Sequence, residues 1–582
     1  MHFLFLSLFL LAACQHSPAP RSSPVLVPAL SSEERDRHER DRHEAIASHF
    51  IVAAQGDHTA LIGQQILAAG GNTIDAAIAA SFAISVERPH STGLGGGGFL
   101  LFRQASSGQI FAVDFRERAP QRATEKMYLD GNGNVIEGRS TTGIHSVAVP
   151  GLVAGLLEIH KRFGSLSLQK ILQPAIDLAE NGFAVYPSLA SALAEEKEDL
   201  AKFPATKKIF FKASGEVYGV GDILIQKDLA KTLRLISQKG RDGFYQGSVA
   251  KALVKESQAR KGLLSEKDLT QYQVRWRNPV RGSFKGFEVV SFPPPSSGGT
   301  HVIEILNILE KDDLKKWGAT SAEAIHLRAS AMQQAFADRA KFMGDPDFVK
   351  DLPQAGLLAK SYAQDQRQKI DLKKARSAQQ VSAGIPPDSE SSETTHFSIM
   401  DKDGNVVVST QTINGYFGSK LVVPGTGVLL NNEMDDFSAK PGSPNIYGAV
   451  GGAANSIQPQ KTPLSSMSPT IVLKDGSPVL ALGAPGGTRI ITCVAQTILN
   501  YLEFKFPLYE SVSAVRFHHQ WQPDHLEIED PGPGEETLQR LKEMGYKIKK
   551  GAIHCNVNAV AKEGQQLHGV ADPRDVGAAL GL

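Results

Sequence analysis

Two runs of alternating apolar and polar residues, 395–400 and 406–412, constrain the fold of this chain more than any other feature. The turn-forming residues 401–405 separate them, so we expect an antiparallel hairpin whose strands enter a core. The preceding segment, 379–393, is polar and rich in turn-forming residues, which predicts a solvated and mobile tether. An exposed tether therefore leads directly into Thr394 at the head of a core strand.

Thr394 stands where a new chain terminus could form. Its hydroxyl could attack the carbonyl carbon of Glu393, and water would open the resulting ester. Thr394 would then carry a nucleophilic oxygen and a free α-amine, whose reference pKa of roughly 7.7 to 8.0 lets it act as its own general base. Taken alone, Thr394 and Thr395 are more simply explained by the β-propensity of threonine at the start of a strand.

The segment 89–99 contains four consecutive glycines. A glycine-rich loop that binds nucleotides follows a strand and opens a helix. Here a helical pattern precedes the glycines and an apolar strand pattern, 99–102, follows them, which argues against nucleotide binding. We therefore expect these glycines to permit a close backbone approach beneath a functional site.

Four sequence motifs give the chain a specific resemblance over most of its length. They are TTHFS at 394–398, LNNEMDDF at 430–437, PLSSMSPT at 463–470 and GAPGGTRI at 483–490. With them, the chain resembles the γ-glutamyltransferase, or γ-glutamyltranspeptidase, family of self-processing N-terminal nucleophile hydrolases, from about residue 50 to the end.

The resemblance implies an α+β fold, a four-layer αββα sandwich, and the alternating helix and strand patterns along the chain fit such layers. It also implies a precursor that cleaves itself between Glu393 and Thr394. The large subunit would comprise 49–393 and the small catalytic subunit 394–582, and together they would form one αββα domain.

The resemblance assigns the chemistry to a few residues. Thr394 is the implied nucleophile, and Thr412 is its implied hydrogen-bond partner. Gly486 and Gly487 lie in a turn between a strand and a helix, where consecutive backbone N–H groups can hold an oxyanion. By spacing alone, the same turn is an ordinary connector.

The resemblance also outlines a pocket for the α-amino acid group of a donor. Arg116 would hold the α-carboxylate, because a guanidinium fork makes two parallel charge-assisted hydrogen bonds. Without the resemblance, Arg116 with Glu117 is more simply a surface ion pair, and the acidic residues below could equally be surface carboxylates. Tyr447, in the Pro- and Gly-rich segment 441–452, is either the gate of a lid or an aromatic side chain that packs a turn. The other implied contacts are Ser465 and Ser466 with the α-carboxylate, and Asn414, Glu433 and Asp436 with the α-ammonium.

The first residues resemble an export signal. The apolar run 1–13 ends in Leu-Ala-Ala before Cys14, as in a bacterial lipoprotein signal peptide. It is shorter than the roughly 20 residues that span a bilayer as a helix. Lipid on Cys14 would anchor the mature chain in the periplasm or cell envelope through a tether and charged spacer, 14–48, and Gln15 favours the outer membrane. The alternative is a short buried N-terminal segment.

Composition limits the other partners. The chain has 582 residues, of which 41% are hydrophobic, so it can bury a large core, and its formal net charge is +1. A charge near zero gives no broad attraction to nucleic acid or anionic lipid, so binding must come from a site. Cys493 and Cys555 lie in or beside apolar stretches, and buried free thiols are favoured over a disulfide. The resemblance implies no metal or organic cofactor.

The implied function is γ-glutamyl transfer and hydrolysis. The γ-glutamyl amide of glutathione-like donors would be cleaved through an ester on Thr394, and water, an amino acid or a peptide would accept the γ-glutamyl group. Two alternatives remain open. A related acylase that removes glutaryl groups from β-lactams would not need Asn414 and Asp436 for an ammonium. A lipoprotein that binds γ-glutamyl peptides without cutting them would require an uncut precursor.

Overall fold

The computed structural model describes residues 40–384 and 395–582. The predicted cleavage bond between Glu393 and Thr394 and the predicted lipidation site Cys14 therefore lie outside the described residues. Within the described part of the chain, no helix has both the length and the apolar character needed to cross a bilayer.

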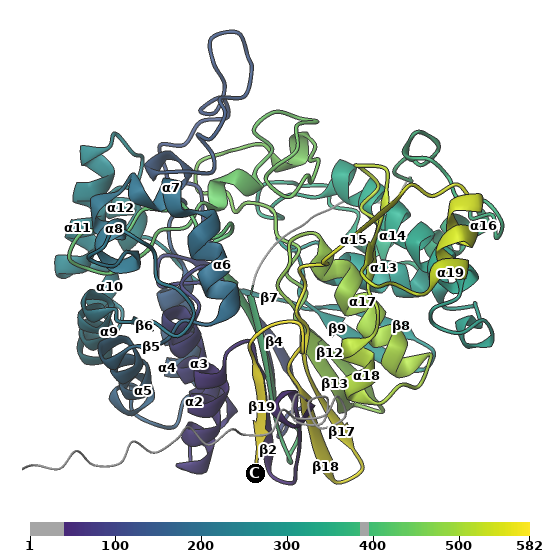
Figure 1. Ribbon diagram of the computed structural model, residues 1–582, viewed down its shortest axis with the longest axis horizontal. Helices are drawn as coiled ribbons and strands as arrows, with labels where there is room; N and C mark the ends of the chain where they lie inside the picture. Colours follow the sequence, from purple (N-terminus) through teal and green to yellow (C-terminus); the bar gives the residue numbers. More distant parts are fainter. Residues whose placement is uncertain (1–39, 385–394) are drawn as a thin grey trace, which may run out of the picture.

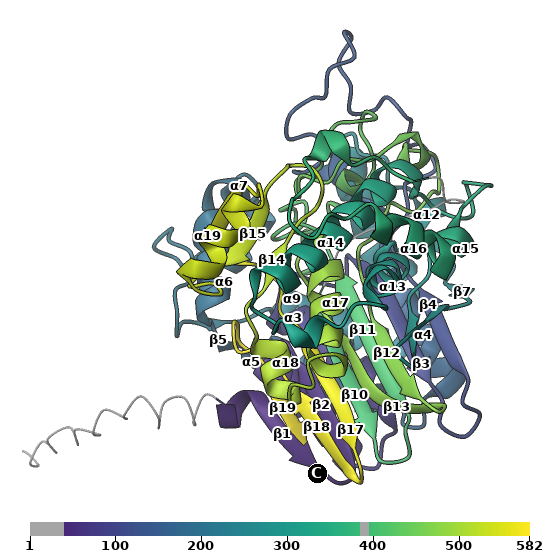
Figure 2. The same ribbon diagram turned by 90° about the vertical axis from the view of Figure 1, so that its right-hand side faces the viewer.

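Two antiparallel sheets, each of seven strands, lie face to face at the centre of the protein (Figure 1, Figure 2). Apolar side chains from both sheets meet between them, and the rings of Phe99 and Phe292 stack there with centroids 4.2 Å apart. In order, the first sheet contains β19 (Ala578–Gly581), β2 (Phe50–Ala54), β10 (Thr395–Asp401), β11 (Val406–Thr412), β3 (Gly97–Arg103), β4 (Ile110–Asp114) and β7 (Arg275–Arg277). The second contains β1 (Glu44–Ala47), β18 (Gln566–Val570), β17 (Asn558–Glu563), β13 (Ser477–Gly483), β12 (Thr470–Lys474), β9 (Phe287–Ser291) and β8 (Val280–Phe284).

Helices cover the outer face of each sheet, so the predicted αββα sandwich is confirmed (Figure 1). Val52 and Leu100 of the first sheet join one helical layer in a common core, and Val472 and Leu480 of the second join the other. The first layer contains α2 (Asp57–Ala68), α3 (Thr73–Glu87), α4 (Leu152–Phe163), α5 (Leu168–Asn181) and α9 (Lys227–Lys239). The second contains α13 (Gly298–Leu309), α14 (Ala322–Phe342), α17 (Arg489–Leu502) and α18 (Leu508–Ser513).

Further elements surround these layers. Cys493 of α17 and Cys555 are both buried as free thiols, as predicted. The other helices are α6 (Pro187–Glu195), α7 (Lys197–Ala201), α8 (Pro204–Phe210), α10 (Asp242–Tyr245), α11 (Gly247–Ala259), α12 (Glu266–Thr270), α15 (Gln354–Leu357), α16 (Lys360–Gln368) and α19 (Glu535–Glu543). The strands of two small sheets are β5 (Phe183–Ala184), β6 (Ile223–Leu224), β14 (Phe517–His518), β15 (Leu526–Glu529) and β16 (Ile548–Gly551).

The predicted hairpin lies at the centre of the first sheet. β10 and β11 pair from Thr395 opposite Gln411 to Met400 opposite Val406. Every residue of β11 is buried, because helices cover one face of the strand and the second sheet covers the other. The hairpin is therefore part of the core, as the alternating runs predict.

The antiparallel order gathers several strand ends at one edge of the first sheet. The start of β10 lies beside the end of β2, where Phe397 is opposite Ala54, and beside the end of β11 on its other flank. Next to β11, β3 begins with Gly97 opposite Thr412, and β4 ends at Asp114. Residues far apart in the sequence thus meet at this edge, which we call the catalytic edge.

The consecutive glycines permit the close backbone approach that the sequence predicts. A Cβ on Gly96 would lie 1.9 Å from the carbonyl oxygen of Thr412, and a Cβ on Gly95 would lie 2.1 Å from that of Leu429. Side chains cannot be accommodated at such distances, so the main chain at 412 and 429 packs directly on these glycines. This contact fixes the end of β11 at the catalytic edge.

Buried titratable side chains lie between α13, α14 and α16. His301 Nδ1 and Glu304 Oε2 are 2.6 Å apart, and Tyr362 donates its hydroxyl to Asp338 Oδ2 at 2.7 Å. Burial raises the pKa of Glu304 to about 8 and lowers the pKa of His301 to about 3. At neutral pH the Glu304 carboxyl is therefore protonated and the His301 imidazole is neutral, and the two side chains share a hydrogen bond.

Glu304→Gln is expected to make the protein less sensitive to rising pH. The folded protein keeps the Glu304 proton up to about pH 8, whereas the unfolded chain releases it near pH 4.5, so wild-type stability falls as pH rises through this window. Gln has no such proton, so the loss in free energy of unfolding between pH 5 and pH 9 should shrink by on the order of 2 kcal/mol. Denaturant unfolding at both pH values measures this loss, with the exposed Glu535→Gln as control. Equal losses in wild type and Glu304→Gln would contradict the assignment.

Candidate active site

The end of β11 supplies two of the predicted site residues. Thr412 Oγ1 accepts a hydrogen bond from the backbone N–H of Asn414 at 2.7 Å. The spacing of two residues between Thr412 and Asn414 predicts both on one face of the returning strand, but β11 ends at Thr412 and Asn414 adopts a left-handed conformation with a φ of 71°. The cause is a hydrogen bond from Ile413 N–H to the Ser91 carbonyl, which takes the chain out of the sheet. Oδ1 of Asn414 is buried and unpaired among the described residues, so it can accept a hydrogen bond from a ligand.

The turn at Gly486 and Gly487 joins β13 to α17, as the sequence predicts. The two residues have φ values of 127° and 68°, and a Cβ on Gly486 would lie 2.2 Å from the carbonyl oxygen of His554. Within the described ranges, neither backbone N–H has a hydrogen-bond partner. The turn therefore offers the two adjacent donors that an oxyanion hole requires.

Arg116 follows β4 and is completely buried. Its Nη1 lies 2.5 Å from Glu433 Oε1, and its Nη2 lies 2.7 Å from Asp436 Oδ2. Both carboxylates belong to one short 3-10 helix, η4 (Glu433–Asp436). The structure thus joins directly the three residues that were assigned to opposite ends of the donor's α-amino acid group.

Ser465 and Ser466 lie beside the same guanidinium. The carbonyl groups of the two preceding residues, 463 and 464, accept hydrogen bonds from Arg116 Nε and Nη2, respectively, each at 3.1 Å. Both serines are buried, and Ser466 Oγ accepts a hydrogen bond from Arg339 Nη2 at 3.5 Å. Arg116 and the two serines are therefore neighbours, as a shared carboxylate site requires.

Glu117 belongs to this cluster, although the motifs do not identify it. Its side chain is completely buried, which excludes an exposed pair with Arg116. Burial raises the pKa of Glu117 to about 7 and the pKa of Glu433 well above its usual range, and the two carboxyls share a hydrogen bond. Near neutral pH one proton is thus held between them, which limits the negative charge around Arg116. The only sequence signal for Glu117 is its position directly after Arg116.

The Pro- and Gly-rich segment 441–452 is tied to the charge cluster. Asn445 donates a hydrogen bond from Nδ2 to Asp436 Oδ1 at 3.0 Å. Tyr447 is partly buried, and it lines the same cavity as Thr412. The segment therefore borders the cavity, and Asn445 is a further contact of Asp436 that the motifs do not identify.

A cavity of about 1150 Å³ opens at the catalytic edge. Its lining contains five of the predicted site residues, namely Thr412, Asn414, Tyr447, Gly486 and Gly487. Arg116, Glu433, Asp436, Ser465 and Ser466 lie outside this lining, in the buried cluster described above.

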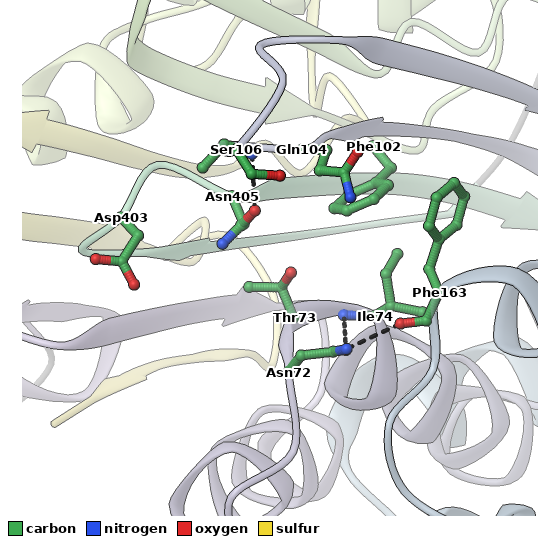
Figure 3. Close-up of a pocket in the computed structure, with 10 residues that line it drawn as sticks. Asn72, Thr73, Ile74, Phe102, Gln104, Ser106, Phe163, Asp403 and Asn405 are labelled. Carbon is green, nitrogen blue, oxygen red and sulfur yellow. Dashed lines mark hydrogen bonds between the residues drawn. The ribbon is translucent and has the colours of Figure 1, made fainter.

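Another cavity, of about 540 Å³, lies at the opposite end of β10 and β11 (Figure 3). Asp403 and Asn405 from the hairpin turn line it, and Phe102 and Phe163 supply an apolar side. Its two asparagines already bind the main chain: Asn72 donates to the Phe163 carbonyl at 2.9 Å, and Asn405 accepts from a backbone N–H at 2.8 Å. It contains none of the predicted site residues, so the cavity at the catalytic edge is the candidate active site.

The fold and this edge define the class of N-terminal nucleophile hydrolases, in which a central strand begins with the nucleophile. A family model described as gamma-glutamyltranspeptidase matches residues 59–582, and the chain belongs to this family. The family and fold inferred from the motifs are thereby confirmed.

Individual relatives include both hydrolases and acylases. The chain is 44% identical over 535 residues to the glutathione hydrolase proenzyme of Escherichia coli strain K12, covering 91% of this chain and 92% of the relative. It is 40% identical over 507 residues to the acylase ACY 1 proenzyme of Pseudomonas sp. strain SE83, covering 86% and 87%. A crystal structure of cephalosporin acylase from Bacillus halodurans matches with a TM-score of 0.82 at 26% identity, covering 97% and 99%.

Arg116→Lys is expected to lower kcat/KM for a donor with a free α-carboxylate by at least about tenfold. A lysine ammonium cannot reproduce the fork that contacts Glu433 and Asp436 together. Steady-state kinetics on fully cleaved protein measures the effect and excludes failed processing as its cause. Arg281→Lys, at an exposed ion pair, is the control. A wild-type rate in Arg116→Lys would remove Arg116 from the donor site.

Proposed function

We propose that the chain is a precursor that cleaves itself before Thr394 and then acts as a glutathione hydrolase and γ-glutamyltransferase. The observation that carries this proposal is the buried ion-pair cluster of Arg116 with Glu433 and Asp436 at the catalytic edge. In this cluster a receptor for a carboxylate and receptors for an ammonium contact one another directly.

The proposed reaction begins when Thr394 Oγ attacks the γ-amide carbon of the donor. The α-amine of Thr394 takes the hydroxyl proton and later gives it to the leaving nitrogen. Gly486 and Gly487 donate their N–H groups to the oxyanion. A γ-glutamyl ester forms, and water, an amino acid or a peptide then attacks it to release the γ-glutamyl group.

The charge cluster suits a donor that carries both an α-carboxylate and an α-ammonium. Arg116 with Ser465 and Ser466 would take the carboxylate, and Asp436 with Asn414 Oδ1 would take the ammonium. Such a group is neutral overall, so it can enter the cluster without changing the net charge of the buried site. A substrate with only one of these charges would leave the other receptor unmatched.

Self-cleavage is the first consequence to test. Purified wild-type protein should run as two fragments, with the smaller beginning at Thr394, whereas Thr394→Ala should remain a single chain. Gel electrophoresis and N-terminal sequencing measure both. An intact wild-type chain would instead favour a lipoprotein that binds γ-glutamyl peptides without cutting them.

Glutaryl acylase activity is the second candidate function, and the sequence identity of 40% to the ACY 1 proenzyme supports testing it. γ-Glutamyl-4-nitroanilide and glutaryl-4-nitroanilide differ only in the α-ammonium, so their comparison isolates the proposed receptor. We expect kcat/KM to favour the γ-glutamyl donor by at least about 100-fold, because a charged group that loses its partners costs several kcal/mol. Equal rates, or a preference for the glutaryl compound, would favour the acylase.

We also propose that lipid on Cys14 anchors the protein in the cell envelope of a bacterium, in the outer membrane. The support is the apolar run 1–13 before Cys14, together with Gln15. The subunits would then face the periplasmic or outer space, where glutathione and γ-glutamyl peptides are the substrates. Membrane fractionation of wild type and Cys14→Ser tests the anchor, and an equal distribution of both proteins would argue against it.

A further inference from the structure

The cavity at the catalytic edge extends away from Arg116. The start of β10 lies between β11 and β2. Arg116 follows β4 on the β11 side, whereas Gln55 follows β2 and Asp575 precedes β19 on the other side. Gln55 and Asp575 line the cavity together with Gly486, and Arg116 does not. With the γ-glutamyl group held at Arg116, the part of the cavity beside Gln55 and Asp575 would receive the group on the far side of the scissile amide.

An arginine and an aspartate form the wall of this cavity on the β2 side. Arg88 is only 2% exposed and donates from Nη2 to Asp575 Oδ2 at 2.7 Å. Asp575 also accepts hydrogen bonds from Gln55 Nε2 at 3.0 Å and from Ser188 Oγ at 2.6 Å. Burial opposes the ionisation of Asp575, but Arg88 and Ser188 outweigh it and lower its pKa to about 2. Both charges are therefore present and fixed in position at neutral pH.

Arg88 has donors that the fold does not use. Its Nε and Nη1 are buried and have no hydrogen-bond partner within the described ranges. The neighbouring His90 has an unpartnered Nδ1, and burial lowers the pKa of His90 well below its usual value, so its imidazole is neutral. Buried guanidinium N–H groups without partners are costly. A carboxylate that reaches Arg88 would supply the missing acceptors.

The other cations that line the cavity are already occupied. Arg574 donates from all three of its nitrogens to Glu529, Asp572 or main-chain carbonyls. Lys420 pairs with Glu196, and Arg489 donates from Nε and Nη2 to Glu527. Arg88 is thus the lining cation best able to accept a new anion.

We propose that Arg88 and Asp575 form a second amino-acid subsite, which binds the free carboxylate of the peptide on the leaving-group side. This inference rests on the proposed function and names the ligand class of the leaving-group side of the site. That class is amino acids and short peptides with a free carboxylate, such as the cysteinylglycine part of glutathione. Like Arg116 with Asp436, this pair is a buried Arg–Asp contact beside the start of β10. The two pairs lie on opposite flanks of the start of β10.

Glutathione and its C-terminal amide provide the test, because they share the γ-glutamyl group and differ only in the distal carboxylate. For wild type, kcat/KM should favour glutathione by about tenfold, the value of one charge-assisted contact. Arg88→Met should bring the ratio close to one. If Arg88→Met fails to fold, Arg88→Lys replaces it as the test, because it keeps a positive charge beside Asp575. Arg88→Lys should lower the ratio at least about threefold. Arg234→Lys on α9 is the distant control, and Arg489→Lys tests the rival cation; both should keep the wild-type ratio.

The outcomes separate this inference from the proposed function. Hydrolysis of γ-glutamyl-4-nitroanilide, which has no distal carboxylate, reports the proposed function alone, and its absence in cleaved wild type would overturn that function. Hydrolysis of the anilide with a wild-type ratio close to one for the two peptides would overturn only the subsite. The subsite would also be overturned if Arg88→Met or Arg88→Lys kept the wild-type preference for glutathione over its amide. Loss of that preference in Arg489→Lys instead would overturn it as well.

Discussion

The pairing of β10 between β2 and β11 is the constraint on which the rest of the structure depends. β10 is hydrogen-bonded on both flanks, so its register is fixed along almost its whole length. Because side chains alternate between faces, a slip of one residue would turn every buried side chain of the strand to the wrong layer. The start of β10 is therefore held at a defined point of the catalytic edge. The glycines that pack on Thr412 and the turn at Gly486 approach this same edge.

The charge cluster around Arg116 is the second requirement, and its energetics follow from burial. A completely buried guanidinium is stable only when its charge and its N–H groups are satisfied. Asp436 and the pair of Glu433 and Glu117, which together hold one proton, supply the charge, and two main-chain carbonyls supply further acceptors. The proton held between Glu117 and Glu433 keeps a third carboxylate from overloading the site with negative charge. The α-carboxylate of a zwitterionic donor can replace the carboxylates on Arg116, and its α-ammonium can replace Arg116 at Asp436. A buried ion pair can therefore serve as a binding site for such a group.

Local patterns in the sequence predict the hairpin, the close approach of the glycines and the turn between β13 and α17, because each depends on neighbouring residues. The αββα layers and the grouping of Arg116 with Glu433, Asp436, Ser465 and Ser466 come from the family resemblance. The left-handed conformation of Asn414 could not be predicted, since it is set by Ser91, far away in the sequence. The same holds for Asn445 on Asp436 and for Arg88 with Asp575, which are 487 positions apart. Only the assembled edge brings them together.

The central claim is that Thr394, the residue before β10 in the sequence, carries the γ-glutamyl group during the reaction. Mass spectrometry of the cleaved enzyme, quenched in acid during turnover of a slow γ-glutamyl donor, tests it most directly. The account predicts that the small fragment gains the mass of one γ-glutamyl group and that the peptide beginning with Thr394 carries it. A γ-glutamyl group on any other residue, or turnover without any labelled fragment, would contradict the account.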